Sequence, residues 1–350
     1  MSEINDKRII SDFRNITFSN YKKNIAKKEL TKTLYESKIE DSCYWCAELI
    51  CAGHFSDIWD IIIIFAGRYI NVGNPKLPIY LDVRFNNFKD ILINGYIDNE
   101  LSLRNNTNIR NLFCEIICIL CNSNKKPVFN TLPNKSFIFN ISDLSNKLKA
   151  PSVDYASVVF LKNDPNELFI AMNELAYHIS NESLNTVECF FWIDWIIDYD
   201  IICKKKKKPL FCEKRNFAPV NEKYQTDIIW IIWDLFLKKT NGNKIKTRLI
   251  ESLLNLFTIR YTPGCKKRRK YLMYNSVNII IESINLKIEI NNKKKDVENI
   301  INKISIIYKQ IKKNEIQPES NYLVDHIEKK SNLDKTLEKL NMMNNMVHYL

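Results

Sequence analysis

The stretch Ser42–Val72, SCYWCAELICAGHFSDIWDIIIIFAGRYINV, decides the fold that this sequence predicts. It predicts two apolar helices joined by a short break at Ala52-Gly53-His54, with Ser42 as the N-cap of the first helix. The large apolar side chains of these helices need a partner surface, and they are Trp45, Leu49, Trp59, Ile62, Ile63 and Phe65. The stretch therefore indicates packing and no reaction.

Composition favours the same fold class along the whole chain. Of 350 residues, 45% are apolar and 26% charged, which is typical of a globular protein and argues against wholesale disorder. Only 6 Gly and 10 Pro occur, fewer than the turns of an all-β fold would need. We therefore expect an all-α protein, a helical bundle or a HEAT-like helical array, with at most a minor short-strand element.

Helix follows helix in the predicted order, with short loops and no alternation of strands and helices. Alternating apolar residues from Ile79 to Phe85 permit a short strand, but the spacing of Phe85 and Phe88 favours a helix there. The expected helices cover residues 21–37, 42–51, 56–72, 79–94, 105–121, 165–180, 184–203, 224–239, 244–259, 266–290, 296–313 and a last segment toward 350.

The domain organisation follows from composition and breaks. A run of five lysines from Lys204 ends at Pro209 and marks a linker. Two W-x-x-W faces, one on each side of that linker, suggest a helical repeat. We expect an N-terminal polar segment and helix at 1–40, a helical domain at 41–203, a basic linker at 204–220, a second helical domain at 221–290 and a charged helical tail at 291–350.

The net charge of +12 favours an anionic partner, such as nucleic acid. Asn, Ile and Lys are, however, over-represented in predicted core and loops alike, and their codons are rich in A and T. An AT-rich genome explains that bias without selection on the protein. The charge alone is therefore a weak sign of nucleic-acid binding.

The position of some cations is more informative than their number. A turn at Pro263-Gly264 leads into a helix that begins with basic residues, and cations oppose the dipole at a helix N-terminus. An external anion would resolve that conflict. The predicted anion or nucleic-acid site comprises Lys266, Lys267, Arg268, Arg269 and Lys270, with Lys204, Lys205 and Lys206 as a second group. The alternatives are solvated charge at both places and, for the lysine run, a nuclear localisation signal.

Ten cysteines occur, mostly inside apolar helical runs, and the N-terminus lacks the apolar core of a signal peptide. This indicates an intracellular, reduced protein. Cys43, Cys46, Cys118 and Cys121 are a candidate tetrahedral thiolate site. Pairs at i, i+3 on apolar helices more often pack in a core, so we expect buried thiols and no metal. The apolar runs are too short and interrupted to span a bilayer.

Catalytic patterns are weak. Asp194 and Asp198 share a helix face at i, i+4 and are candidates to hold Mg²⁺ or act as acid and base. The favoured alternative is a solvated or lysine-paired acidic face. The four histidines are scattered, and neither GxGxxG nor GxxxxGK[ST] occurs. We expect no cofactor, no small-molecule substrate and no enzymatic activity.

Three regions together resemble a known family: the W-C-A-E-L-I-C-A-G-H-F-S-D-I-W run at Trp45–Trp59, the G-N-P-K-L-P-I-Y run at Gly73–Tyr80, and D-I-I-W-I-I-W-D at Asp227–Asp234 with L-F-T-I-R-Y at Leu256–Tyr261. They resemble an uncharacterised core protein of the nucleocytoplasmic large DNA viruses of algae and amoebae, over most of residues 40–290. The resemblance carries no catalytic residues. It implies a virus factory in the host cytoplasm or the virion, with the nucleus as an alternative location.

These observations predict a non-enzymatic helical scaffold of a large DNA virus that contacts nucleic acid or the replication and transcription machinery, together with viral protein partners. The alternative is a virion structural or assembly protein without affinity for nucleic acid. Salt-sensitive binding to oligonucleotides separates the two hypotheses.

Overall fold

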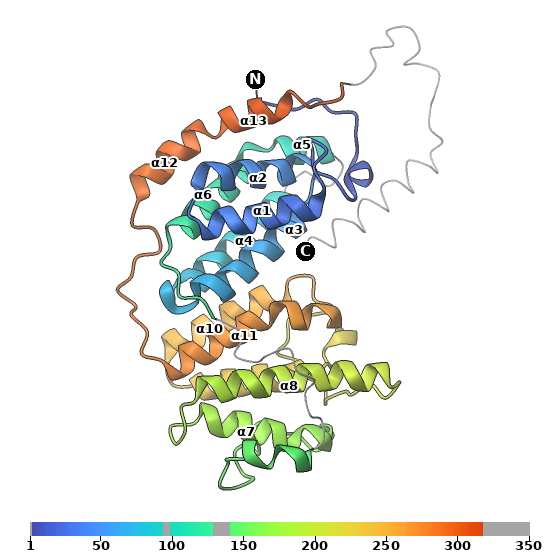
Figure 1. Cartoon of the computed structure of the whole chain (residues 1–350), viewed down its shortest axis with the longest axis vertical. Helices are drawn as coiled ribbons and strands as arrows, with labels where there is room; N and C mark the ends of the chain where they lie inside the picture. Colours follow the sequence, from blue (N-terminus) through green and yellow to red (C-terminus); the bar gives the residue numbers. More distant parts are fainter. Residues whose placement is uncertain (1, 94–98, 129–140, 318–350) are drawn as a thin grey trace. The chain divides into compact units, whose positions relative to one another are not determined.

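The computed structural model describes residues 2–93, 99–128 and 141–317 (Figure 1). Across these residues the chain forms helices and no β-strand, apart from one isolated bridge between Ile16 and Lys22. The all-α prediction is thus confirmed, and the segment that allowed a strand is the helix α4 (Leu77–Ile93). Within the same residues no helix is long and apolar enough to cross a membrane.

Two compact units divide the chain, and each is built from separate stretches of sequence. Of the described residues, the first unit takes 2–62, 83–93, 99–123 and 290–317, and the second takes 63–82, 124–128 and 141–289. The expected linker at 204–220 lies inside the second unit. There Arg215 forms a buried ion pair with Asp164 at 2.6 Å, so this stretch is packed.

The first unit groups helices from both ends of the chain. Helices α1, α2 and α6 lie side by side, with α12 against α6 and α13 against α2 (Figure 1). Its helices are α1 (Lys23–Tyr35), α2 (Ile39–Cys51), α5 (Glu100–Asn105), α6 (Thr107–Asn122), α12 (Lys294–Lys303) and α13 (Ser305–Lys312), and it shares α3 (Phe55–Phe65) and α4 with the second unit.

An aromatic cluster forms the core of the first unit. The Trp59 ring centroid lies 5.0 Å from that of Phe85, 5.8 Å from Phe88 and 5.5 Å from Phe113. Edge-to-face and tilted rings at such distances add to the stability that burial alone provides. The expected partner surface for Trp59 is therefore supplied by α4 and α6.

The break between the two apolar helices is where the sequence predicts it. Gly53 has φ +72°, and a Cβ there would lie 2.7 Å from Cγ1 of Ile10. Only glycine fits that conformation and that space without strain. The predicted N-cap at Ser42 is wrong, because α2 already begins at Ile39 and the Ser42 hydroxyl donates to the Lys38 carbonyl at 2.7 Å.

The second apolar helix ends earlier than predicted. After α3 ends at Phe65, the chain continues as a π-helical turn at Ala66–Ile70 and a 3-10 turn at Asn71–Gly73. A Cβ on Gly67 would lie 3.1 Å from the Tyr271 backbone carbonyl. Glycine here lets the π-turn approach α11 closely within the second unit.

The second unit stacks α7 against α8, and α8 against α11, which also contacts α9 and α10 (Figure 1). The tryptophans of both W-x-x-W pairs are almost fully buried, Trp192 and Trp195 on α8 and Trp230 and Trp233 on α9. The helices are α7 (Phe169–Ile179), α8 (Thr186–Lys205), α9 (Ile229–Thr240), α10 (Lys244–Thr258) and α11 (Lys266–Ile281).

Short 3-10 turns complete the described chain, at Ile10–Phe13, Ile141–Lys147, Asn166–Leu168, Glu222–Tyr224 and Pro263–Cys265. The helix expected over 296–313 is two helices, because α12 ends at Lys303 and α13 begins at Ser305. The last helix predicted toward Leu350 lies outside the described residues.

Candidate functional site

The basic start of α11 points inward. Lys266 is the first residue of this helix, as predicted, but only 2% of its surface is exposed. Its Nζ lies 2.5 Å from Oδ2 of Asp200 and 2.7 Å from Oδ1 of Asp227. Burial acts to lower the pKa of Lys266, but the two carboxylates outweigh burial and raise that pKa.

The next turn of α11 repeats the arrangement. The buried Lys270 ammonium donates to both carboxylate oxygens of Asp194, at 2.8 and 2.9 Å. Arg269, also buried, donates to the carbonyls of Phe257 and Ile259, where α10 ends. These donors satisfy acceptors that would otherwise be unpaired in the protein interior.

Two members of the predicted site face solvent. Lys267 and Arg268 are exposed, and Lys267 pairs with Asp198 at 2.7 Å. Carboxylates of α8 and of the loop before α9 thus neutralise the lysines at the start of α11, and no external anion is needed to offset the helix dipole. Asp194 and Asp198, the candidate metal or acid–base pair, are both lysine-paired, as the alternative interpretation holds.

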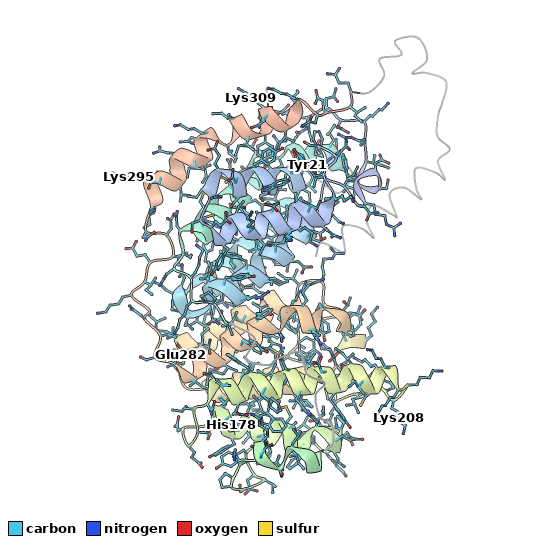
Figure 2. All side chains as sticks on the ribbon, in the orientation of Figure 1. Tyr21, His178, Lys208, Glu282, Lys295 and Lys309 are labelled. Atoms are coloured by element: carbon cyan, nitrogen blue, oxygen red, sulfur yellow. The ribbon has the colours of Figure 1, made fainter. Side chains whose placement is uncertain are left out.

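The second predicted group is more accessible. Lys204 pairs with Asp200 at 2.8 Å, whereas Lys205, the last residue of α8, and the following Lys206, Lys207 and Lys208 are exposed. We call these four residues the α8-end lysines. In the described part of the chain no carboxylate pairs with them, and Lys208 extends away from the helix (Figure 2). Lys206 and Lys208 line an open hollow of about 720 Å³, next to Tyr199 and Glu167.

A further group of exposed cations escaped the sequence analysis. Along α12 and α13 a stripe of apolar side chains packs against the rest of the first unit, with Val297, Ile304, Tyr308 and Ile311 buried. These two helices and their ends also carry lysines that are exposed and that form no ion pair among the described residues, and Figure 2 labels two of them, Lys295 and Lys309. These tail lysines are Lys293, Lys294, Lys295, Lys303, Lys309 and Lys313. Helical spacing of the apolar stripe was the signal that could have identified this face.

Three cysteines of the first unit form a group that differs from the predicted set. The Sγ atoms of Cys43, Cys114 and Cys118 all lie within 4.8 Å of one another, and the three residues are at most 4% exposed. We call this set the thiol cluster. Cys46 and Cys121 do not belong to it, and the Cys121 thiol donates to the Ser42 hydroxyl at 3.6 Å instead. Cys114 was missed, although its i, i+4 spacing to Cys118 places both on one helix face.

The buried histidines are held in structural contacts. The His54 Nε2 lies 2.9 Å from the Ile16 carbonyl oxygen, and burial lowers the His54 pKa. The His178 Nδ1 lies 2.8 Å from the Ser183 hydroxyl, but its Nε2 is 3.7 Å from Glu174, too far for a hydrogen bond. A serine–histidine–acid relay is thus not formed at this position.

No family model matches this chain, and neither a curated protein nor a solved structure does. The fold and the geometry define an all-α protein in which part of the basic residues is neutralised internally.

Proposed function

We propose that this chain is a non-enzymatic helical scaffold that binds nucleic acid through exposed lysines. The observation that carries the proposal is the contrast between two kinds of cation. Lys266 and Lys270 at the start of α11 form ion pairs with buried carboxylates. The α8-end lysines and the tail lysines have no such partner among the described residues. Unpaired cations at a surface are the groups that replace the counterions of a phosphate backbone.

Binding of the full chain to duplex and single-stranded oligonucleotides across a salt series tests this function. The affinity should fall steeply with salt, by roughly 0.9 logarithmic units per decade of salt for each phosphate contact on duplex DNA. Replacing the four α8-end lysines with Gln should lower that slope by up to roughly 3 to 4. The same replacement at Lys295, Lys303, Lys309 and Lys313 tests the tail lysines.

A matched control removes the same charge from paired lysines. The variant with Lys38, Lys126, Lys147 and Lys214 changed to Gln loses four cations that each have a carboxylate partner. Its salt dependence should stay close to that of the wild type. If the slope of affinity against salt fell equally in the control and in both test variants, net charge alone would govern binding. The proposed sites would then be rejected.

The biological setting we propose is a large DNA virus, in a virus factory or the host nucleus, where such a scaffold serves replication or transcription with viral partners. Its support is the resemblance of Trp45–Trp59, Gly73–Tyr80 and the Trp230 region described above. Labelled protein that stays away from sites of viral DNA synthesis in infected cells would contradict this setting.

The second candidate is a virion structural or assembly protein. The internal pairing of Lys266 and Lys270 with Asp side chains favours it, because these buried cations serve packing and contribute little to an external field. Abundance in purified particles together with no oligonucleotide binding at low salt would support this candidate over the first.

A further inference from the structure

We propose that the thiol cluster binds one thiophilic metal ion through the sulfurs of Cys43, Cys114 and Cys118. The three sulfurs already lie within 4.8 Å of one another. An ion with metal–sulfur bonds of about 2.3 Å holds its sulfur ligands about 4 Å apart. Small rotations of the side chains would therefore bring all three sulfurs to bonding distance.

The elements that carry the cluster are suited to a fixed site. Cys43 lies in α2, and Cys114 and Cys118 lie one turn apart in α6. These two helices pack directly against each other in the first unit, so the three ligands come from rigid segments of one compact body. Sites built on packed helices hold their ligands more accurately than sites on loops.

The burial of the cluster supports the same conclusion. Cysteine binds a metal as the thiolate, so binding displaces the protons of the three thiols. A buried negative charge is costly without a cation, and the metal ion provides that cation.

The number and kind of ligands select the ion. Thiolates are soft ligands that favour Cu(I) and Zn²⁺. Structural Zn²⁺ takes four ligands, and the described residues place no fourth Cys, His, Asp or Glu in this group. Because the cluster is at most 4% exposed, water is a poor substitute for a fourth ligand. Three buried sulfurs therefore fit a three-coordinate Cu(I) better than Zn²⁺.

The experiment uses the reduced full chain without oxygen, titrated separately with Cu(I) and Zn²⁺ against a competing chelator. Bound metal per chain and sulfur-to-metal charge-transfer absorption are measured. One Cu(I) per chain is expected, bound more tightly than Zn²⁺. In Cys43→Ala and Cys118→Ala the affinity should fall by more than about 100-fold, because losing a ligand exceeds the 10- to 100-fold cost of losing a second-shell partner.

Cys51→Ala is the matched control, since it removes another buried thiol of α2 that lies outside the cluster. It should bind Cu(I) like the wild type. Equal binding by Cys43→Ala and the wild type would overturn the proposal, as would the absence of Cu(I) binding. Tighter binding of Zn²⁺ would overturn the three-coordinate assignment.

A measurement on the wild type covers the case in which the variants do not fold. X-ray absorption at the copper edge reports the atoms bound to the ion. Three sulfurs at about 2.3 Å are expected. A shell with fewer than three sulfurs, or one dominated by nitrogen and oxygen, would contradict the site.

Discussion

Adjacent lysines in this protein have opposite environments, and this contrast governs what a substitution does. Lys266 is buried between Asp200 and Asp227, while the side chain of its neighbour Lys267 is 62% exposed and pairs with Asp198. Removing one partner from a buried ion pair leaves an uncompensated charge, whereas an exposed pair contributes little.

Lys266→Met is expected to lower the free energy of unfolding by about 3–5 kcal/mol, because two buried carboxylates lose their cation. Lys267→Met, the neighbouring control, should cost about 0–1 kcal/mol. Denaturant unfolding followed by circular dichroism measures both. Similar values for the two variants would show that Lys266 is not buried as described. Charge reversal at Lys266 would unfold the protein, so it is unsuited to binding experiments.

Gly53→Ala should lower the free energy of unfolding by about 2–3 kcal/mol, because it adds a positive-φ penalty and a contact with Ile10. Gly242→Ala is the control for backbone conformation, since Gly242 has φ +97° and its Cβ would meet no atom within 4 Å. The difference between the two variants measures the clash with Ile10. Equal losses would mean that Ile10 moves aside freely.

Acidification below neutral pH should destabilise the protein through its buried histidines. Burial lowers the pKa of both His54 and His178, so the unfolded chain binds more protons in this range. Stability should therefore fall as the pH drops through about 6.5, by up to about 1.4 kcal/mol per pH unit for each histidine. Unfolding of the wild type and of His54→Gln between pH 7.5 and 5.5 tests this, with a shallower slope in the variant. Parallel slopes would remove His54 as a contributor.

At the level of elements, apolar periodicity gave a good prediction of where most helices lie, whereas the N-cap predicted at Ser42 was wrong. The helices with strong apolar spacing, such as α6 and α10, were found close to their predicted bounds. The interruption at Ile304 and the π-turn at Ala66–Ile70 were not predicted. Both keep a helical pattern of side chains and differ from an α-helix only in local hydrogen bonding.

The candidate site shows why local patterns do not suffice. The sequence places cations at the start of α11, but most of their carboxylate partners lie on α8, which is more than sixty residues away along the chain. One feature was available: Lys266 and Lys270 have the i, i+4 spacing of Asp194 and Asp198, so each helix presents one charged face. Complementary faces of that kind predict a pairing of helices, although the register that joins Lys270 to Asp194 follows only from the packing.

This pairing of α8 with α11 has a measurable coupling. Asp194→Asn and Lys270→Met should each be destabilising, because each leaves the other member of a buried pair without its partner. The double variant should be more stable than the sum of the two losses predicts, with an interaction energy of about 1–3 kcal/mol. Chemical unfolding of the four proteins in this cycle provides the value. Strict additivity would mean that the two helices are not joined by this pair.

At the scale of the whole molecule, the net charge of +12 gives an incomplete account of the surface. The α8-end lysines and the tail lysines remain available to an external partner, whereas Lys266 and Lys270 do not. Neither the division into two units nor the place of α12 and α13 in the first unit follows from linear domain boundaries. Both depend on the packing of α12 and α13 against α6 and α2, which lie much earlier in the chain. Local sequence patterns do not predict such distant contacts.

That return sets an order of events during synthesis on the ribosome. The backbone N–H of Lys7 donates to the Ile316 carbonyl, and Tyr308 is buried against the Arg110 guanidinium, 4.0 Å from its ring centroid. Lys7 therefore waits for Ile316, while the whole second unit is made in between. A nascent chain stalled near residue 290 lacks α12 and α13, which cover α6 and α2 in the folded protein, and apolar surface left exposed in this way favours aggregation and chaperone binding.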